Sequence, residues 1–344
     1  MTTAPARLGE RLQHQHGLLW LHRMKGDPYA ALLCDVDEDP EPLRARVRAA
    51  GPLWRSATGP WVTGDPALGA ALLADPRLAP VPVLPGDGDG DDGAGGGPRP
   101  AGPVPPPETA RIRVPEGLGP EFDLVTDVAE PLAAAALAEV CGIPADEHQA
   151  FARAVTACGT ALDATVCPQR LDTTRRLHTA ADALRSLLAA VPGAPAPATV
   201  VAAARTGADL VVRALLRARF PLPPAAVGPT VSDALRERPP AWIVPLVARA
   251  EVPLAGERIA AGERVAVLAG DGPGHGDGQG RGRDRDLTAF RRALAEGALA
   301  AFAARYGGLR PAGPAVRRPR APLTRGPARV PVRATAAAPG GGSR

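Results

Sequence analysis

Acidic side chains at alternate positions are the residues in this chain whose spacing could bind a metal ion. Asp87, Asp89 and Asp91 alternate in "DGDGDDGAGGGP", as the first ligands of a calcium-binding EF-hand loop do. The sixth position of that loop needs glycine and the twelfth needs a bidentate glutamate, but the chain has Asp92 and Pro98 there. The spacing therefore favours a polar linker over a calcium site.

Other patterns that could support chemistry are incomplete. The glycine-rich stretch "GDGPGHGDGQG" contains no GxGxxG in any register, and no GxSxG surrounds a serine. The cysteines have neither CxxC nor histidine-spaced metal-ligand patterns: Cys34, Cys141, Cys158 and Cys167. We therefore expect no catalytic residue, no cofactor and no metal site, and reduced, partly buried thiols.

Composition restricts the class of protein. The chain has 344 residues, 45% of them hydrophobic, so it can bury a large core. Its net charge of +4 does not require a nucleic-acid partner. The arginines of "RGRDRD" alternate with aspartates and have no aromatic neighbours for base stacking, which favours a solvated loop. No apolar run approaches the roughly 18 to 20 residues that span a bilayer. We expect a soluble, cytoplasmic protein that binds neither nucleic acid nor membrane.

Apolar spacing and turn residues predict a mainly helical chain with short strands. Leu18, Leu19 and Leu21 are expected on an apolar helical face before an interruption at residues 26–28. "GPLWRSATGPWVTGD" predicts two short strands, and Asp65 predicts the N-cap of the next helix. A second hairpin is predicted to turn at residues 261–262. The later helices are predicted at residues 123–141, 145–167, 170–190, 198–220, 229–237 and 287–306.

Glycine, proline and aspartate dominate the segment after the first sheet. Residues 86–110 are too poor in apolar side chains to offset the entropy of ordering them, so we predict a flexible linker there. The tail from residue 334 to 344 is predicted to be disordered. The remainder, residues 1–333, is predicted to be one domain that this linker interrupts.

Several segments follow one another in a familiar order. They include "GPLWRSATGPWVTGDPALGAALLADPRL", "FDLVTDVAEPLAAAALAEVCGIPADE", "VSDALRERPP" and "LTAFRRALAEGALAAFAARYGGLR". Together they resemble a cytochrome P-450 of the actinobacterial kind over nearly the whole chain, with the last two similar to its K and L helices. The resemblance implies a mainly α fold with small β-sheets, truncated between Pro76 and Phe122 and lacking the haem-ligand loop.

The chain departs from this family where the family holds haem. The family has a cysteine thiolate before the L helix, and alignment of that helix places Arg285 there. Its oxygen-activating helix has small-Gly-x-acid-Thr, whereas residues 206–210 end in Leu210, without the hydroxyl. Leu246 stands where a basic residue usually meets a haem propionate. The resemblance therefore implies that these are lost cofactor positions and that the chain is not an enzyme.

One charged pair persists from the K helix of the family. Asp233 and Arg236 stand three residues apart and resemble its Glu-x-x-Arg pair. We interpret them as a structural ion pair.

Some relatives of cytochrome P-450 are auxiliary proteins that bind and activate a deoxysugar glycosyltransferase in macrolide and anthracycline pathways. "GLLWLHRMKGDPYAALL" and the segment after it are similar to those auxiliaries. The resemblance implies a cognate glycosyltransferase as partner in a hetero-oligomer, with two copies of each protein as one arrangement. The partner-binding candidates are Trp20, His22, Asp27, Tyr29 and Trp54, although these residues could equally dock the first helix onto the body.

Two other functions remain open from the sequence. One is a haem-binding monooxygenase that has adopted another axial ligand, for which His275 is the candidate in the glycine-rich loop. The other is a basic nucleic-acid-binding module, which salt-dependent retention on DNA or RNA would reveal.

Overall fold

The computed structural model describes residues 5–34, 39–87, 103–237, 241–269 and 282–336. The elements of its N-terminal half are α1 (Pro5–Met24), α2 (Pro28–Cys34), α3 (Glu41–Ala49), β1 (Trp54–Arg55), β2 (Trp61–Thr63), α4 (Pro66–Ala74), β3 (Leu78–Pro80), the 3-10 turn η1 (Thr109–Arg111), β4 (Glu121–Asp123), the π-helical η2 (Leu124–Ala129), α5 (Glu130–Val140), η3 (Ala145–Glu147), α6 (His148–Ala157) and α7 (Ala161–Ala164).

The elements of the C-terminal half are α8 (Leu171–Ala189), α9 (Pro197–Arg217), η4 (Pro224–Ala226), α10 (Val227–Glu237), β5 (Ile243–Ala248), β6 (Val252–Leu254), β7 (Glu257–Ile259), β8 (Arg264–Leu268), α11 (Gly282–Arg305), β9 (Tyr306–Pro311), β10 (Val316–Arg317), β11 (Pro327–Arg329) and β12 (Pro331–Ala336). The architecture is mainly helical with small sheets, as the sequence predicts.

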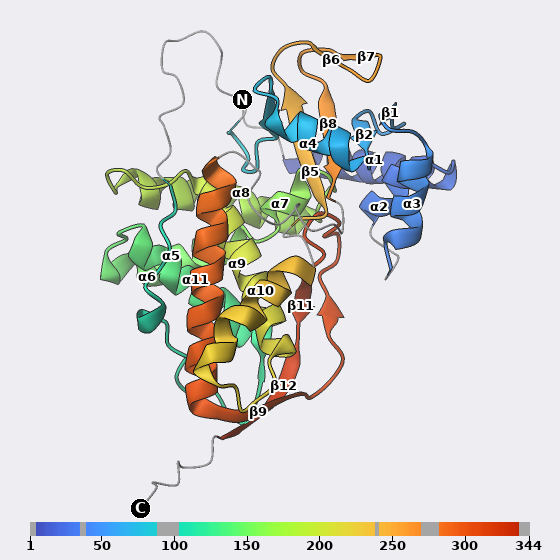
Figure 1. Cartoon of the computed structure of the whole chain (residues 1–344). Helices are drawn as coiled ribbons and strands as arrows, with labels where there is room; N and C mark the ends of the chain where they lie inside the picture. Colours follow the sequence, from blue (N-terminus) through green and yellow to red (C-terminus); the bar gives the residue numbers. More distant parts are fainter. Residues whose placement is uncertain (1–4, 35–38, 88–102, 238–240, 270–281, 337–344) are drawn as a thin grey trace, which may run out of the picture.

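A helical body surrounds α9, which contacts α5, α10 and α11 (Figure 1). Most residues of α9 are buried, because the helix is apolar on nearly every side and is enclosed by its neighbours. The small residue Gly207 lets α11 approach closely: a Cβ atom there would lie 3.0 Å from Leu294 Cδ2 and 3.4 Å from a ring carbon of Phe290. The main core therefore lies between these helices.

A five-stranded sheet in the order β1-β2-β8-β5-β3 carries the N-terminal helices (Figure 1). Successive residues of β8 point to opposite faces, as strand geometry requires. Ala266 belongs to the core cluster beneath α2 and α3, whereas Val265 and Val267 belong to the cluster that includes Leu72 of α4. The sheet is thus buried on both faces and joins the N-terminal helices to the body.

Both predicted features at the start of this sheet are confirmed. β1 and β2 form an antiparallel pair with Trp54 opposite Val62. The Asp65 carboxylate accepts a hydrogen bond from the Leu68 amide at 2.8 Å and so caps α4.

The second predicted hairpin turns at a different place. β6 pairs with β7 around Ala255 and Gly256, which have φ values of 52° and 82°. The predicted turn at residues 261–262 instead leads from β7 into β8, which pairs with β5 and β2. The prediction of the turn position is therefore wrong, although the chain does change direction there.

Several predicted boundaries differ from the structure. The helix predicted at residues 145–167 is divided into η3, α6 and α7, and the one predicted at residues 198–220 ends at Arg217. The last long helix begins at Gly282, five residues before the predicted start. Within the predicted linker, residues 88–102 lie outside the described part, but Val104 is 1% exposed in the main core. β12 extends to Ala336, so the first three residues of the predicted tail form a strand, and residues 337–344 lie outside the described residues.

Candidate partner-binding surface

The helix α1 carries an exposed apolar face. Leu18, Leu21 and Met24 are 41%, 47% and 77% exposed, and their spacing of three residues places them along one side of the helix. Leu19, which points the other way, is 5% exposed and belongs to the core beneath α2. The sequence predicted an apolar face here but not that most of it would face outward.

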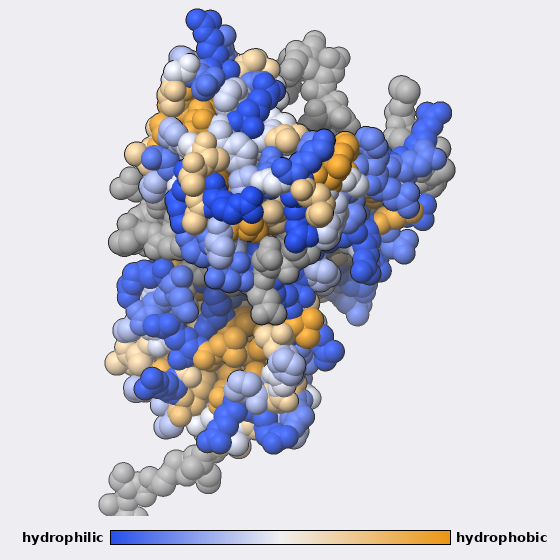
Figure 2. Space-filling view, turned by 90° about the vertical axis from the view of Figure 1, so that its right-hand side faces the viewer, coloured by the Kyte–Doolittle hydropathy of each residue, from blue (hydrophilic) through white to orange (hydrophobic). Residues whose placement is uncertain are grey.

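The surface near the N-terminal helices is otherwise mixed. Figure 2 shows separate hydrophobic patches among hydrophilic residues on the side of the molecule toward which α2 and α3 lie. Basic residues Arg23 and Lys25 follow the exposed face of α1, and no acidic residue follows Glu10 in this helix. The exposed face of α1 therefore combines apolar side chains with a positive rim.

Trp20 is half-buried and its ring is fixed on the helix. Its Nε1 donates a hydrogen bond to His16 Nε2 at 3.1 Å, and Arg23 Cζ lies 4.7 Å from the ring centroid. Burial and the nearby charge of Arg320 lower the pKa of His16, which favours the neutral ring that accepts this bond. Trp20 is thus held in one orientation beside the exposed face.

Asp27 uses its carboxylate inside the chain. Oδ1 accepts a hydrogen bond from the Ala30 amide at 2.9 Å, at the start of α2. Oδ2 accepts hydrogen bonds from the Ser56 hydroxyl at 2.8 Å and the Ala57 amide at 2.7 Å. Asp27 therefore ties α2 to the β1–β2 turn, which is the structural role that the sequence left open for this group of residues.

The other predicted contact residues differ in exposure. Tyr29 is 1% exposed in the core beneath α2 and is not a surface residue. Trp54 is half-buried and donates from Nε1 to the Val47 carbonyl oxygen at 3.2 Å. His22 is half-buried, and its Nδ1 atom is enclosed without a hydrogen-bond partner. The five candidates thus lie in or beside α1, α2 and β1, which are neighbours in Figure 1. Of these candidates, the side chains of Trp20, His22 and Trp54 are partly accessible.

A cavity of about 740 Å³ lies beneath α1. His22 and Tyr29 line it, together with residues of β8 and of the segment after α7. No local pattern in the sequence predicts this cavity, because its walls come from seven separate parts of the chain.

Two of the positions aligned with haem contacts of the family hold buried leucines. Leu210 is 0% exposed within α9, and Leu246 is 4% exposed in β5, where it pairs with Pro80 and Val265. Neither side chain can pair with a carboxylate or transfer a proton. Arg285 lies in the first turn of α11, and a guanidinium cannot ligate iron. His275, the alternative axial ligand, lies outside the described residues.

Cys141 and Cys158 are buried thiols. Burial raises the pKa of Cys141 to about 12 and that of Cys158 to about 11, so both thiols are protonated at neutral pH. No cluster of three or more His, Cys, Asp or Glu residues that could hold a metal ion occurs among the described residues.

Asp233 and Arg236 form an ion pair on the surface of α10. Asp233 also lies 3.6 Å from Arg217 of α9. Both side chains of the pair are more than two-fifths exposed, so the pair adds little to stability.

Comparison with known proteins gives relatives that match almost the full chain. Protein AknT of Streptomyces galilaeus is 31% identical and protein DesVIII of Streptomyces venezuelae 33% identical, each aligned over 96% of this chain and over 96% and 94% of its own length. EryCII of Saccharopolyspora erythraea, named as a cytochrome P-450 family protein, is 31% identical over 96% of this chain and 99% of its own. No family model matches the sequence.

Solved structures share the fold. The open cytochrome P-450 EryK of S. erythraea superposes with a TM-score of 0.61 at 18% identity, over 87% of this chain and 96% of that one. A ligand-free cytochrome P-450 of Mycobacterium smegmatis gives 0.60 at 19% identity, over 89% and 99%. In the described residues, no helix is both long enough and apolar enough to cross a membrane.

Proposed function

This chain belongs to the cytochrome P-450 superfamily, and we propose that within it the protein is a non-catalytic auxiliary that binds a TDP-deoxysugar glycosyltransferase of macrolide or anthracycline biosynthesis. It activates or stabilises that enzyme and takes no part in the chemistry. On this proposal the fold is a truncated one without the haem-ligand loop, and the chain up to the end of β12 at Ala336 acts as one domain.

The observation that carries the proposal is that the chain has the cytochrome P-450 fold but apolar residues at two positions aligned with haem contacts of the family. Leu210 and Leu246 are both buried within apolar clusters, and a cation at position 246 would be enclosed by apolar side chains at a high desolvation cost. The resemblance of residues 17–33 to auxiliary proteins, and the full-length match to AknT and DesVIII, support the same assignment.

We assign the exposed face of α1 to the transferase. An apolar stripe with a positive rim fits a partner surface that is apolar at its centre and acidic at its edge. Trp20 is suited to anchor the contact because its ring is large and already held by His16 and Arg23. A partner present at a hundredfold its dissociation constant stabilises the bound state by about 2.7 kcal/mol, which is enough to rescue a marginal enzyme.

Co-expression with the cognate transferase tests this assignment. Leu21→Asp should weaken co-purification and lower the rate of sugar transfer, with a loss of about 2 kcal/mol or roughly 30-fold in affinity for a central contact. Leu216→Asp is the matched control, since Leu216 is also 47% exposed but lies on α9. Trp20→Ala should likewise weaken pairing while the fold is kept.

Two results would defeat the proposal. Sugar transfer that is equally fast and equally durable without this protein would remove the activator role. A strong Soret band from purified protein with stoichiometric haem would instead favour the rival function, a monooxygenase with an altered axial ligand.

A further inference from the structure

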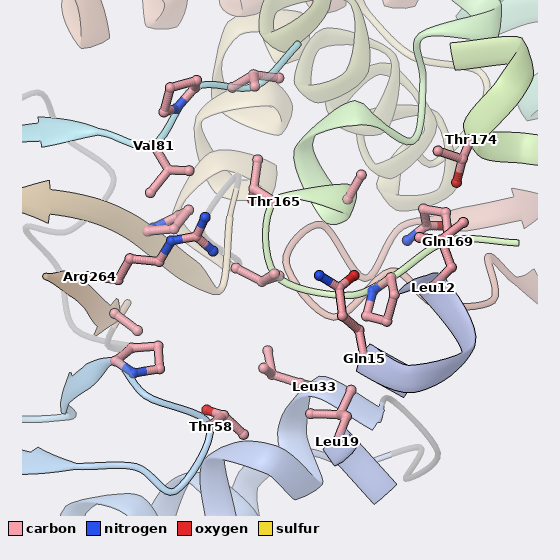
Figure 3. A pocket seen from close by; sticks show the side chains of 18 of the residues that line it. Leu12, Gln15, Leu19, Leu33, Thr58, Val81, Thr165, Gln169, Thr174 and Arg264 are labelled. Carbon is pink, nitrogen blue, oxygen red and sulfur yellow. The ribbon is translucent and has the colours of Figure 1, made fainter. Parts of the chain in front are cut away.

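The cavity beneath α1 has the size of a small-molecule site. Its volume of about 740 Å³ falls within the range of roughly 300–1,000 Å³ that ligand pockets occupy. Its walls come from α1, α2, the turn at residues 57–60, the segment 81–85, the segment from α7 into α8, β5 and β8 (Figure 3). Among the described residues, none of α9 lines it, so the cavity is separate from Leu210.

Two guanidinium groups line this cavity. They belong to Arg11 and Arg264, and no aspartate or glutamate lines it among the described residues. Arg264 extends from β8 into the cavity in Figure 3. Its guanidinium has no ion-pair partner among the described residues, whereas Arg55 of the same sheet is paired with Glu263 and Arg213 of α9 with Asp209. An unpaired guanidinium in a concave site offers charge-assisted hydrogen bonds to an anion.

Most of the other residues that line the cavity are apolar. Leucine and valine side chains contribute from five of the wall segments: Leu12, Leu19, Leu33, Val83, Leu177 and Val265. A few neutral polar groups stand between them, among them Gln15, Thr165 and Gln169, which Figure 3 shows around the same space. Burial raises the pKa of the Tyr29 hydroxyl, so this lining residue also stays neutral.

We propose that this cavity binds a small anionic amphiphile, a carboxylate with an apolar body, whose head group pairs with Arg264 and whose body lies against the leucines and valines. The two arginines disfavour a cationic ligand, and the apolar side chains disfavour a bare inorganic anion. α1 covers one side of the cavity: Leu18, Leu19 and His22 line it, whereas Leu21 and Met24 are exposed and do not. Occupancy would therefore brace the same helix that we assign to the transferase.

Calorimetric titration of the purified protein alone with decanoate tests the site. We expect saturable binding of one decanoate per chain, and Arg264→Gln should weaken it about tenfold through loss of the charge-assisted bond. Arg258→Gln is the matched control, because Arg258 lies on β7, outside the cavity, and should bind decanoate like the parent. Decanol should bind the parent and Arg264→Gln equally, and decyltrimethylammonium should bind neither.

Two further variants locate the binding. Val83→Trp places an indole ring in the cavity and should weaken binding of both decanoate and decanol, with an unchanged melting temperature as the check on folding. Leu21→Asp should leave decanoate binding intact; a loss there would place the probe on the exposed face of α1 and overturn the proposal. Equal decanoate affinity of the parent and Arg264→Gln would also overturn it, as would the absence of saturable binding. Because no transferase is present, this outcome is independent of the auxiliary role.

Discussion

Replacing Asp163 with alanine should strongly destabilise the protein. Asp163 is 1% exposed in α7, and its Oδ1 accepts hydrogen bonds from the Leu323 amide at 2.9 Å and the Thr324 amide at 3.0 Å. Its Oδ2 accepts a third from the Thr324 hydroxyl at 2.8 Å. This carboxylate therefore fixes the segment before β11 onto the part of the chain that leads into the cavity wall.

The expected loss follows from the groups left behind. Two buried backbone amides would lose their acceptor, at about 1–3 kcal/mol each, while the Thr324 hydroxyl can turn elsewhere. The buried guanidinium of Arg205, 5% exposed, would also lose the favourable charge of Asp163. We expect a total loss of about 3–5 kcal/mol, a large part of the 5–15 kcal/mol that typically stabilises a native protein.

Urea unfolding measures this loss as a lower midpoint with an unchanged slope. Thr324→Val is the control, because it removes one hydrogen bond and leaves both amides paired, at a cost of about 1 kcal/mol. If Asp163→Ala costs no more than Thr324→Val, the carboxylate does not hold this segment and the reasoning fails.

Two further perturbations test the packing and the electrostatics. Gly297→Ala should cost about 1–3 kcal/mol despite its better helix propensity, because the added Cβ would lie 2.6 Å from Ile112 Cδ1; Gly228→Ala, with nothing nearer than 3.9 Å, should cost nothing in the same urea titration. The folded-state pKa of His16 is lowered, so the stability that its neutral form contributes is present above about pH 6.5 and is lost as the pH falls through the folded pKa. His16→Gln should therefore flatten the decline of the urea midpoint between pH 7.5 and 5, and a parallel decline in both proteins would contradict this.

Elements that begin or end with capping or turn residues could be predicted from local sequence. Asp65 before a proline marks a helix start by a mechanism that needs no tertiary context, and the cap is present. The turn of the second hairpin was predicted at the wrong position because two Ala-Gly pairs, at residues 255–256 and 261–262, carry the same local signal. Gly256 and Gly262 both have positive φ. Only the pairing of β8 with β5 and β2 decides which pair closes the hairpin.

The site was predicted less completely than the fold. The resemblance pointed to α1 and its neighbours, but residue types do not distinguish an anchor that faces a partner from one that faces the core. Tyr29 and Trp20 illustrate this, since one is buried and the other is half-buried nine residues earlier on the chain. Arg264 could not be identified either, because its significance depends on wall segments far apart in the sequence.

The parallel pairing of β2 with β8 has a consequence for synthesis. It sets Trp61 opposite Val265, so roughly 200 residues must leave the ribosome before the first sheet can close. At a translation rate of about 5–20 residues per second, the apolar faces of α2 and α4 stay exposed for some 10–40 s before β8 can pack against them. The nascent N-terminal region is therefore prone to aggregation during this interval. A chaperone or a binding partner would protect it most effectively at that stage.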